Sequence, residues 1–336
     1  MVVKKEREYW IEVLRAFACL MVLFCHSPQP FSEYIGGSFI VGVVNYFGMG
    51  LGPYLFFMIS GACIMSHPVE AAPFLKRRLG RVLLPTFFWS LIYIFFEDCI
   101  WHTAQAGSLV ERALLVLFGP QYGIMWFMYA LISIYLVTPI ISHWLYCCSK
   151  KEVQIYLGLW SIVLIIPFAS IFFEEVATIK DPNNILYYFS GFLWLAVLGS
   201  YCRRYVKFEK FNWLNIFLIS LALVSPLFTF VIQLCGGTKV STCYTLNCIF
   251  VTLLVFVMVS SIKWKKQSNV ILLFSKLSFG IYLTHMLFMY PFNQWISQFH
   301  INYVIQVPIS VTCVGVLSFI FTWLLNKLPF SKYILG

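Results

Sequence analysis

The apolar stretch at residues 9–26 carries three ionisable side chains that could do chemistry, Glu12, Arg15 and His26. In a helix, Glu12 and Arg15 are three positions apart and can pair on one face. Arg15 and His26 are eleven positions apart, close to three whole turns, so both project from one side about 16 Å apart along the axis. Ionisable groups inside apolar helices are costly and by default mark a functional site. The alternative is an arginine that extends to the surface and a histidine at a helix end.

A basic cluster, Lys76-Arg77-Arg78-Leu-Gly-Arg81, precedes another apolar stretch. Arg78 and Arg81 are three positions apart and share a helical face, and such a fork of guanidinium groups suits bidentate contacts to phosphate. By itself the cluster also fits an ordinary cytoplasmic anchor. Together with a histidine one helix length away, it favours a cofactor that has phosphates at one end and a reactive group on a long arm.

A third candidate site lies in Ser278-Phe-Gly-Ile-Tyr-Leu-Thr-His285. Tyr282 and His285 lie on one helical face, and Gly280 permits the close approach of a neighbouring helix. His285 is either a second proton-handling group or a hydrogen-bonded interior histidine. The other histidines lie near the ends of apolar stretches without the spacing of ligands, so no metal site is predicted.

The elements that must position these residues are membrane helices. Of the 336 residues, 61% are hydrophobic and only 11% are charged, whereas about a quarter of a soluble domain is charged. A helix needs roughly 20 apolar residues to cross a bilayer. The sequence predicts an all-α integral membrane protein, a bundle of about ten transmembrane helices. Their ranges are 9–26, 42–66, 82–101, 124–144, 153–173, 185–202, 212–234, 244–262, 270–292 and 304–325.

Charge predicts the orientation of this bundle. Of the 23 lysines and arginines, all except Arg112, Lys180 and Lys239 lie at the termini or in alternate inter-helix regions. Positive charge kept on one face marks cytoplasmic loops, so both termini are expected in the cytoplasm and the net charge of +10 indicates no nucleic-acid partner. Arg15 interrupts the first apolar stretch and no cleavage site follows it, which favours a retained helix over a signal peptide.

Two small-residue features lie outside these candidate sites. Cys235 and Cys243 flank one predicted outer loop and could form a disulfide. Ser60-Gly61 is interpreted chiefly as a site of close helix packing.

Taken in order, these motifs resemble the acyltransferase-3 family of multi-pass membrane acyltransferases. The matching segments are Glu12 to His26 with its Arg-x10-His element, Phe56-Phe-Met-Ile-Ser-Gly61, Lys76 to Arg81 with its Arg-x2-Arg element, Trp126-Phe127 through Pro139, and Gly280 to His285. The family usually has Asp where Glu12 stands. The resemblance implies a single transmembrane acyltransferase domain over residues 1–336, in the bacterial inner membrane among membrane lipids, which O-acetylates a surface polysaccharide or lipid-linked glycan.

The resemblance also implies a mechanism that agrees with the residue types. Acetyl-CoA is the expected acyl donor, as a cosubstrate, and no permanently bound cofactor is expected. The basic residues expected to hold its phosphates are Arg78 and Arg81, helped by Lys76, Arg77 or Arg15. The pantetheine arm would then run past Arg15 towards His26.

His26 is expected either to remove the proton from a sugar hydroxyl or to accept the acyl group itself. Both roles need a neutral imidazole, which a water-poor site favours. The carboxylate that orients His26 could be Glu33, Glu97 or Asp98. The acyl chain, acetyl or succinyl, stays open.

Two other classes of protein remain as alternatives. Ten helices with internal charges also fit a transporter of a glycan or acylated metabolite, although the inverted repeats expected of a carrier are not found in the sequence. The same fold could also serve as a non-catalytic membrane partner in a biosynthetic complex.

Overall fold

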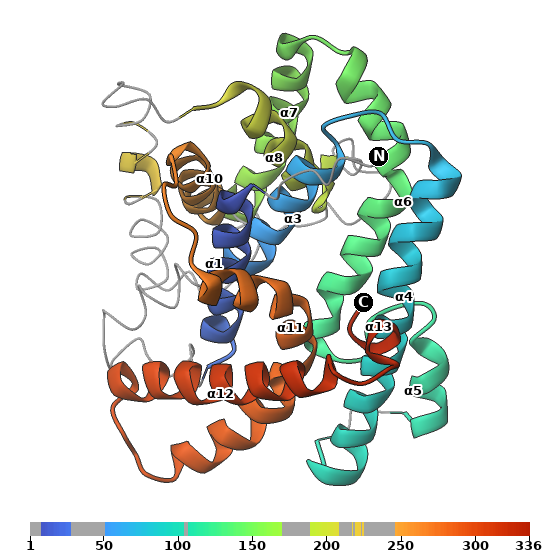
Figure 1. The fold of residues 1–336 in the computed structure, drawn as a ribbon, viewed down its shortest axis with the longest axis vertical. Coiled ribbons are helices and arrows are strands. Elements are labelled where there is room, and N and C mark those ends of the chain that lie inside the picture. Colours follow the sequence, from blue (N-terminus) through green and yellow to red (C-terminus); the bar gives the residue numbers. More distant parts are fainter. Residues whose placement is uncertain are drawn as a thin grey trace.

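The computed structural model describes residues 8–27, 51–103, 107–169, 189–207, 217, 219–222, 224 and 246–336. Glu33 and the Cys235–Cys243 pair lie outside the described residues. The described part is a helical assembly, shown in Figure 1. Its helices are α1 (Tyr9–Cys25), α3 (Leu51–Ile64), α4 (Ala71–Phe95) continued by a π-helical turn η2 (Phe96–Ile100), α5 (Leu109–Leu115), a 3-10 turn η3 (Gly123–Met125), α6 (Trp126–Cys147), α7 (Lys150–Ala169), α8 (Leu193–Tyr205), α10 (Leu246–Ser261), α11 (Asn269–Ser297), α12 (Tyr303–Leu325) and α13 (Ser331–Ile334).

Four helical segments of the described residues are long and apolar enough to cross a membrane. They are Ala71–Ile100, Gly123–Cys147, Asn269–Ser297 and Ile305–Leu325. Large apolar side chains stay exposed on them, for example Ile140 at 72%, as lipid-facing positions require. The chain is therefore a helical membrane protein, and the full count of ten spans and the side of the termini stay predictions.

The predicted ranges and the observed helices agree closely at most positions. Each predicted span overlaps a described helix except 212–234, of which the structure describes only a few residues. The largest difference is in α4, which begins at Ala71, whereas the predicted span begins at residue 82. Among the described residues, two α-helices were not predicted: the short α13 lies beyond the last predicted span, and α5 lies within residues 102–122, a region predicted to be an outer loop. Its first turn is capped by Ser108, whose hydroxyl accepts a hydrogen bond of 3.2 Å from the Glu111 amide. The Ser-x-x-Glu pattern there is a helix-start signal that the hydrophobicity count overlooked.

Helix α1 lies at the centre and contacts α3, α10, α11 and α12 (Figure 1). Helices α3 and α8 pack so closely that both need glycine at the contact. A Cβ at Gly61 would overlap the Ala196 backbone, and one at Gly199 would overlap the Met58 backbone. The small-residue packing predicted at Ser60-Gly61 is thus confirmed.

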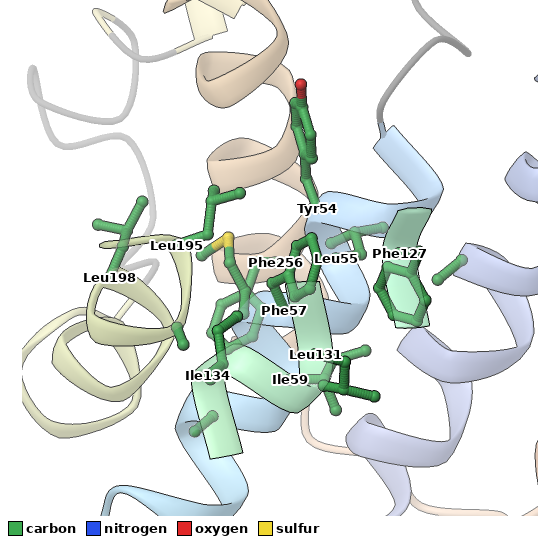
Figure 2. Close-up of a cluster of buried hydrophobic side chains, with 14 of the residues drawn as sticks. Tyr54, Leu55, Phe57, Ile59, Phe127, Leu131, Ile134, Leu195, Leu198 and Phe256 are labelled. Carbon is green, nitrogen blue, oxygen red and sulfur yellow. The ribbon is translucent and has the colours of Figure 1, made fainter. Parts of the chain in front are cut away.

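Helices α1, α3, α4, α6, α7, α8, α10 and α11 all contribute to the apolar core beside this contact, and Figure 2 shows the part of it formed by α3, α6, α8 and α10. Helix α3 supplies Tyr54, Leu55 and Phe57, which are almost completely buried. The rings of Phe57 and Phe127 of α6 lie 4.7 Å apart between centroids, and Phe256 of α10 is also fully buried. This core holds α1, α3 and α6 in fixed positions around the site described below.

Two arginines in the last turn of α8 tie helix ends together. Arg204 donates hydrogen bonds to the carbonyls of Met65, Ser66 and Leu145 at 2.8, 3.0 and 2.7 Å. It therefore supplies donors to backbone carbonyls just after α3 and near the end of α6. Arg203 donates to the carbonyl of Ala62 at 2.9 Å and pairs with the Glu8 carboxylate at 2.5 Å. Carbonyls at helix C-termini lack intrahelical donors, so these contacts stabilise the helix ends.

Candidate active site

A cavity of about 480 Å³ opens between residues of α1, α3, α4, α6, α11, α12 and α13. Five cationic side chains from four elements line it, namely Arg15, Arg78, Arg81, Lys276 and Lys332. No carboxylate side chain is among the described residues of its lining. The cavity therefore has the positive character that a phosphate-bearing ligand requires.

Arg78 is the most constrained of these cations. Its guanidinium lies 5.9 Å from the ring centroids of both Phe74 and Tyr135. Its Nε atom is buried without a hydrogen-bond partner among the described residues. Arg81 follows one helical turn later and also lines the cavity, so the predicted fork of two guanidinium groups faces one space.

Lys76 and Arg77, the other two predicted phosphate ligands, are exposed on α4. Neither is among the described residues of the cavity lining. This follows from helical geometry, because residues one and two positions before Arg78 project about 100° and 200° away from it.

Glu12 fixes Arg15 at the edge of the cavity. The Glu12 carboxylate is 2% exposed, accepts a hydrogen bond of 2.5 Å from the Ser275 hydroxyl, and lies 3.4 Å from the Arg15 guanidinium. The pair expected from the i,i+3 spacing is therefore present. Because Ser275 belongs to α11, the carboxylate also links α1 to α11.

His26 and His285 come together from distant parts of the sequence. His26 follows α1 directly, His285 lies in the middle of α11, and their ring centroids are 5.2 Å apart. The backbone carbonyl of His26 accepts a hydrogen bond of 3.1 Å from the Asn293 side chain of the same helix, α11. This contact holds the end of α1 beside His285.

Hydrogen bonding selects one tautomer of His285. Its Nδ1 atom lies 2.6 Å from the Tyr282 carbonyl oxygen, and because a carbonyl only accepts, Nδ1 carries the proton. In the neutral ring, Nε2 then has a free lone pair, and it is buried without a hydrogen-bond partner among the described residues. A buried imidazole with an available lone pair is equipped to accept a proton or a hydrogen bond.

An aromatic layer separates the cavity from the two histidines. Tyr282 lines the cavity, donates a hydrogen bond of 2.5 Å to the Ile124 carbonyl, and has its ring centroid 6.0 Å from that of His285. Phe127, which also lines the cavity, packs 5.2 Å from the Tyr282 ring. Neither histidine is among the described lining residues, so the described cavity ends about one helical turn short of His285.

Of the five cations that line the cavity, sequence reasoning missed two, Lys276 and Lys332. Both were counted only as positive charges at the cytoplasmic ends of spans. For Lys276 a signal existed, since it lies two residues before the segment Ser278 to His285. For Lys332 none existed, because only the folding back of α13 onto α4 brings it to the cavity.

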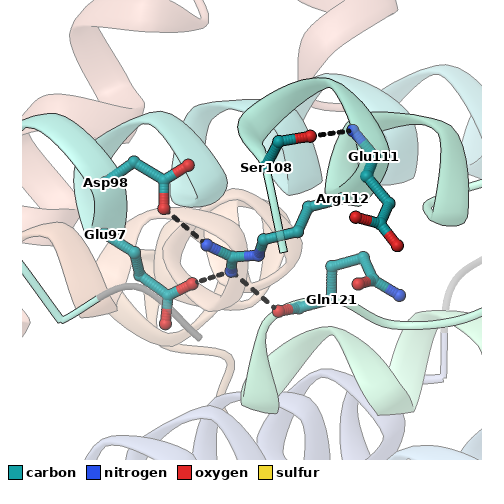
Figure 3. Close-up of polar contacts among 6 residues, drawn as sticks. All are labelled: Glu97, Asp98, Ser108, Glu111, Arg112 and Gln121. Carbon is teal, nitrogen blue, oxygen red and sulfur yellow. Dashed lines mark hydrogen bonds and ion pairs between the residues drawn. The ribbon is translucent and has the colours of Figure 1, made fainter. Parts of the chain in front are cut away.

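Two of the three carboxylates proposed to orient His26, Glu97 and Asp98, are engaged elsewhere. Figure 3 shows Arg112 of α5 held between Glu97 and Asp98 of η2, with Asp98 at 2.7 Å and the Gln121 carbonyl at 3.3 Å. Arg112 is 2% exposed, so this is a buried ion-pair network. Within the described residues, no carboxylate forms an ion pair with His26.

The aromatic rings beside this network are also tightly packed. The rings of Tyr122 and Tyr93 stack with centroids 4.3 Å apart. Burial, reinforced by the nearby Glu97 carboxylate, raises the pKa of Tyr122, so its hydroxyl stays protonated at neutral pH. In the described part of the chain, no group of three His, Cys, Asp or Glu residues could hold a metal ion.

Comparison with known proteins identifies one family. The family model described as an acyltransferase domain, Acyl_transf_3, matches residues 8–327, nearly the whole chain. No curated protein and no solved structure matches the chain.

Proposed function

The chain belongs to the acyltransferase-3 family, and we propose that it transfers an acetyl group from acetyl-CoA to a hydroxyl of a surface polysaccharide or lipid-linked glycan. The observation that carries this proposal is the juxtaposition of a cation-lined cavity with a buried histidine pair. Tyr282 belongs to the cavity wall and contacts His285, so one residue joins the two features.

The cavity is proposed as the site of the CoA phosphates. Arg78 and Arg81 present a guanidinium fork, and Arg15 is held beside them by Glu12. Guanidinium groups bind phosphate oxygens in pairs and keep their charge at all physiological pH values. Both protein termini and this cavity would then face the cytoplasm, where acetyl-CoA is made, in the inner membrane of a bacterium.

The histidine pair is proposed as the site of acyl transfer. His26 removes the proton from the acceptor hydroxyl while that oxygen attacks the thioester carbonyl carbon. The carbon–sulfur bond then breaks, and the imidazolium returns its proton to the CoA thiolate. His285 Nε2 accepts a hydrogen bond from the His26 imidazolium, the part that a carboxylate plays in other catalytic histidine sites.

The aromatic layer must rearrange for the thioester to reach the histidines. The arm of acetyl-CoA is long and thin, and Tyr282 and Phe127 stand between the cavity and His285. Rotation of these rings about their side-chain bonds opens the path without helix movement. Such a rotation would break the hydrogen bond of Tyr282 to the Ile124 carbonyl and its packing against Phe127.

The experiment is acetyl transfer by purified protein in lipid nanodiscs, with radiolabelled acetyl-CoA and the glycan extracted from the parent strain. Labelled glycan and free CoA are expected from the wild type, and neither from His26→Ala at equal protein level. Normal transfer by His26→Ala would remove His26 from the mechanism. Movement of glycan across the membrane without thioester consumption would instead support a transporter.

A further inference from the structure

Residues 331–336, which include α13 and are called the α13 segment below, form part of the cavity wall. The residues of this segment that line the cavity are Ser331, Lys332, Leu335 and Gly336. Arg78 and Arg81 of α4 line the same cavity. A segment about 250 positions away in the sequence therefore completes the site that the two guanidinium groups begin.

The α13 segment lies directly on α4 and α11. A Cβ at Gly336 would lie 2.8 Å from the Arg81 carbonyl oxygen, so the two backbones are in contact there. Leu335 is 8% exposed, and its side chain would lie 3.2 Å from a Cβ placed at Gly280 of α11. The segment therefore bridges the helix that carries Arg81 and the helix that carries Lys276.

Trp89 of α4 holds the backbone of the α13 segment. The indole is 3% exposed, and its N–H donates a hydrogen bond of 2.8 Å to the Ile334 carbonyl. A buried indole N–H needs an acceptor, so this contact constrains both partners. Trp89 follows Arg78 by eleven positions, close to three helical turns, and both side chains therefore project from one side of α4. Since Ile334 is two residues after Lys332, the hydrogen bond also fixes the backbone that carries this lysine.

The chemistry of Lys332 makes this fixed backbone important. The side chain is exposed, and its ammonium group lies 4.9 Å from the Tyr333 ring centroid. An ammonium group is a compact charge with three donors and binds phosphate oxygens well. The long side chain loses conformational freedom when it binds a ligand, so an already ordered backbone keeps the total cost of binding low.

We propose that Lys332 is a ligand of the diphosphate group of the acyl donor and that Trp89 is a positioning residue that acts through Lys332. The α13 segment then clamps an anionic ligand against Arg78 and Arg81. The identity of the donor as acetyl-CoA rests on the proposed function. The clamp itself requires only a ligand that carries a diphosphate, so it can be tested without acyl transfer.

The test measures the affinity of purified protein in lipid nanodiscs for CoA and for inorganic diphosphate by titration calorimetry. Lys332→Gln is expected to weaken both about tenfold, since one charge-assisted contact is lost. Trp89→Phe keeps the ring but removes the N–H donor, and it should weaken both roughly threefold to tenfold. The double variant Trp89→Phe/Lys332→Gln should be no weaker than Lys332→Gln alone, because residues that act through one contact are not additive.

Two further readouts separate positioning from simple stabilisation of the fold. Lys332→Arg should bind CoA within about twofold of the wild type, because the charge is kept. In acetyl transfer, Trp89→Phe should raise the KM for acetyl-CoA by the factor seen in binding and leave kcat within about twofold.

Trp264→Phe is the matched control. The Trp264 indole also donates to a backbone carbonyl, that of Val259 at 3.3 Å, and is not among the described lining residues. Its replacement should leave both affinities unchanged. Melting temperatures of all variants show whether each of them is folded, and the exposed Lys332 can be replaced without disturbing the core.

The outcomes separate the clamp from the proposed function. Wild-type affinity for both ligands in Lys332→Gln, or fully additive losses in the double variant, overturns the clamp while CoA remains the donor. Binding of diphosphate that depends on Lys332 and Trp89, without binding of CoA, supports the clamp and overturns the donor. Failure of the wild type to bind either ligand overturns both.

Discussion

At the scale of single residues, the chemistry depends on which atom of each polar group is left free. The Tyr282 carbonyl accepts a hydrogen bond from Nδ1–H of His285, so the lone pair of this imidazole is on Nε2. The Ser275 hydroxyl donates a hydrogen bond to Oε2 of Glu12, and the Arg15 guanidinium pairs with Oε1 of the same carboxylate. In both cases a neighbour on the same or an adjacent helix decides the role of the functional atom.

His285→Asn should lower the acyl-transfer rate about 100-fold or more, since a positioned proton-handling group contributes at least that factor. The asparagine amide keeps an N–H donor for the Tyr282 carbonyl but lacks the Nε2 lone pair. The rate is measured with radiolabelled acetyl-CoA at saturating acceptor.

His143→Asn serves as the control for this substitution. His143 makes the same type of contact, with Nδ1 2.7 Å from the Pro139 carbonyl of α6, but it is exposed. Its replacement should leave the rate unchanged. A rate for His285→Asn equal to that of His143→Asn would show that His285 is a packing residue.

Glu12→Gln should raise the KM for acetyl-CoA about tenfold with a smaller change in kcat. The amide retains a hydrogen bond with Ser275 but no longer attracts the Arg15 guanidinium, and one charge-assisted contact contributes on that order. Steady-state kinetics at varied acetyl-CoA concentration measure the effect. A loss confined to kcat would contradict a role for Glu12 through donor binding.

At the scale of helices, glycines at the contact points determine how closely neighbouring helices pack. Gly61 and Gly199 let the backbones of α3 and α8 touch, and Gly280 lets α11 approach Thr322 of α12. Since α3 and α11 both line the cavity, its shape depends on these glycine contacts.

Gly61→Leu should prevent accumulation of folded protein, because its Cβ would collide with the Ala196 backbone and backbone cannot move out of the way locally. Size-exclusion profiles and melting temperatures in detergent provide the measurement. Gly158→Ala in α7 is the control, since nothing lies within 4 Å of its Cβ position. That change should be neutral or stabilise the helix by roughly 0.5–1 kcal/mol.

The buried ion pairs between η2 and α5 supply a second helix-scale prediction. Arg112→Met should destabilise the protein by about 3–5 kcal/mol, because Glu97 and Asp98 would be left as buried, unpaired carboxylates. The melting temperature measures the loss. Adding Glu97→Gln and Asp98→Asn should recover part of it, and no recovery would mean that the guanidinium acts through packing alone.

At the scale of the whole molecule, the arrangement places the cation-lined cavity and the unpredicted helix α5 at opposite ends of α4. The cation-lined cavity adjoins the first half of α4, whereas η2 and α5 follow its last residue. A chain of this layout can take a donor from one side of the membrane and an acceptor from the other.

The orientation is tested by labelling single cysteines in intact cells with a membrane-impermeant maleimide, in a background without the native cysteines. Thr103→Cys, beyond η2, should react from outside, whereas Ser149→Cys, between α6 and α7, should react only after lysis. Both positions are exposed. The reverse pattern would place the cationic cavity outside the cell and remove acetyl-CoA as its ligand.

The sequence by itself determined the features that depend on composition and on local helical geometry. A hydrophobic content of 61% identifies a membrane protein whatever its topology, because too little polar surface exists to meet water. The i,i+3 spacings of Glu12 with Arg15 and of Arg78 with Arg81 predict neighbours correctly, since helices α1 and α4 alone bring them together.

Only the tertiary structure decided which distant segments share a site. The contact of His26 with His285 depends on the packing of α1 against α11, and the place of Lys332 depends on α13 folding back onto α4. Helix periodicity carries no information about such contacts, because it defines a face of each helix but not the helix that the face meets. The packing of apolar surfaces and glycine contacts selects that partner, and the chemistry of the site follows from it.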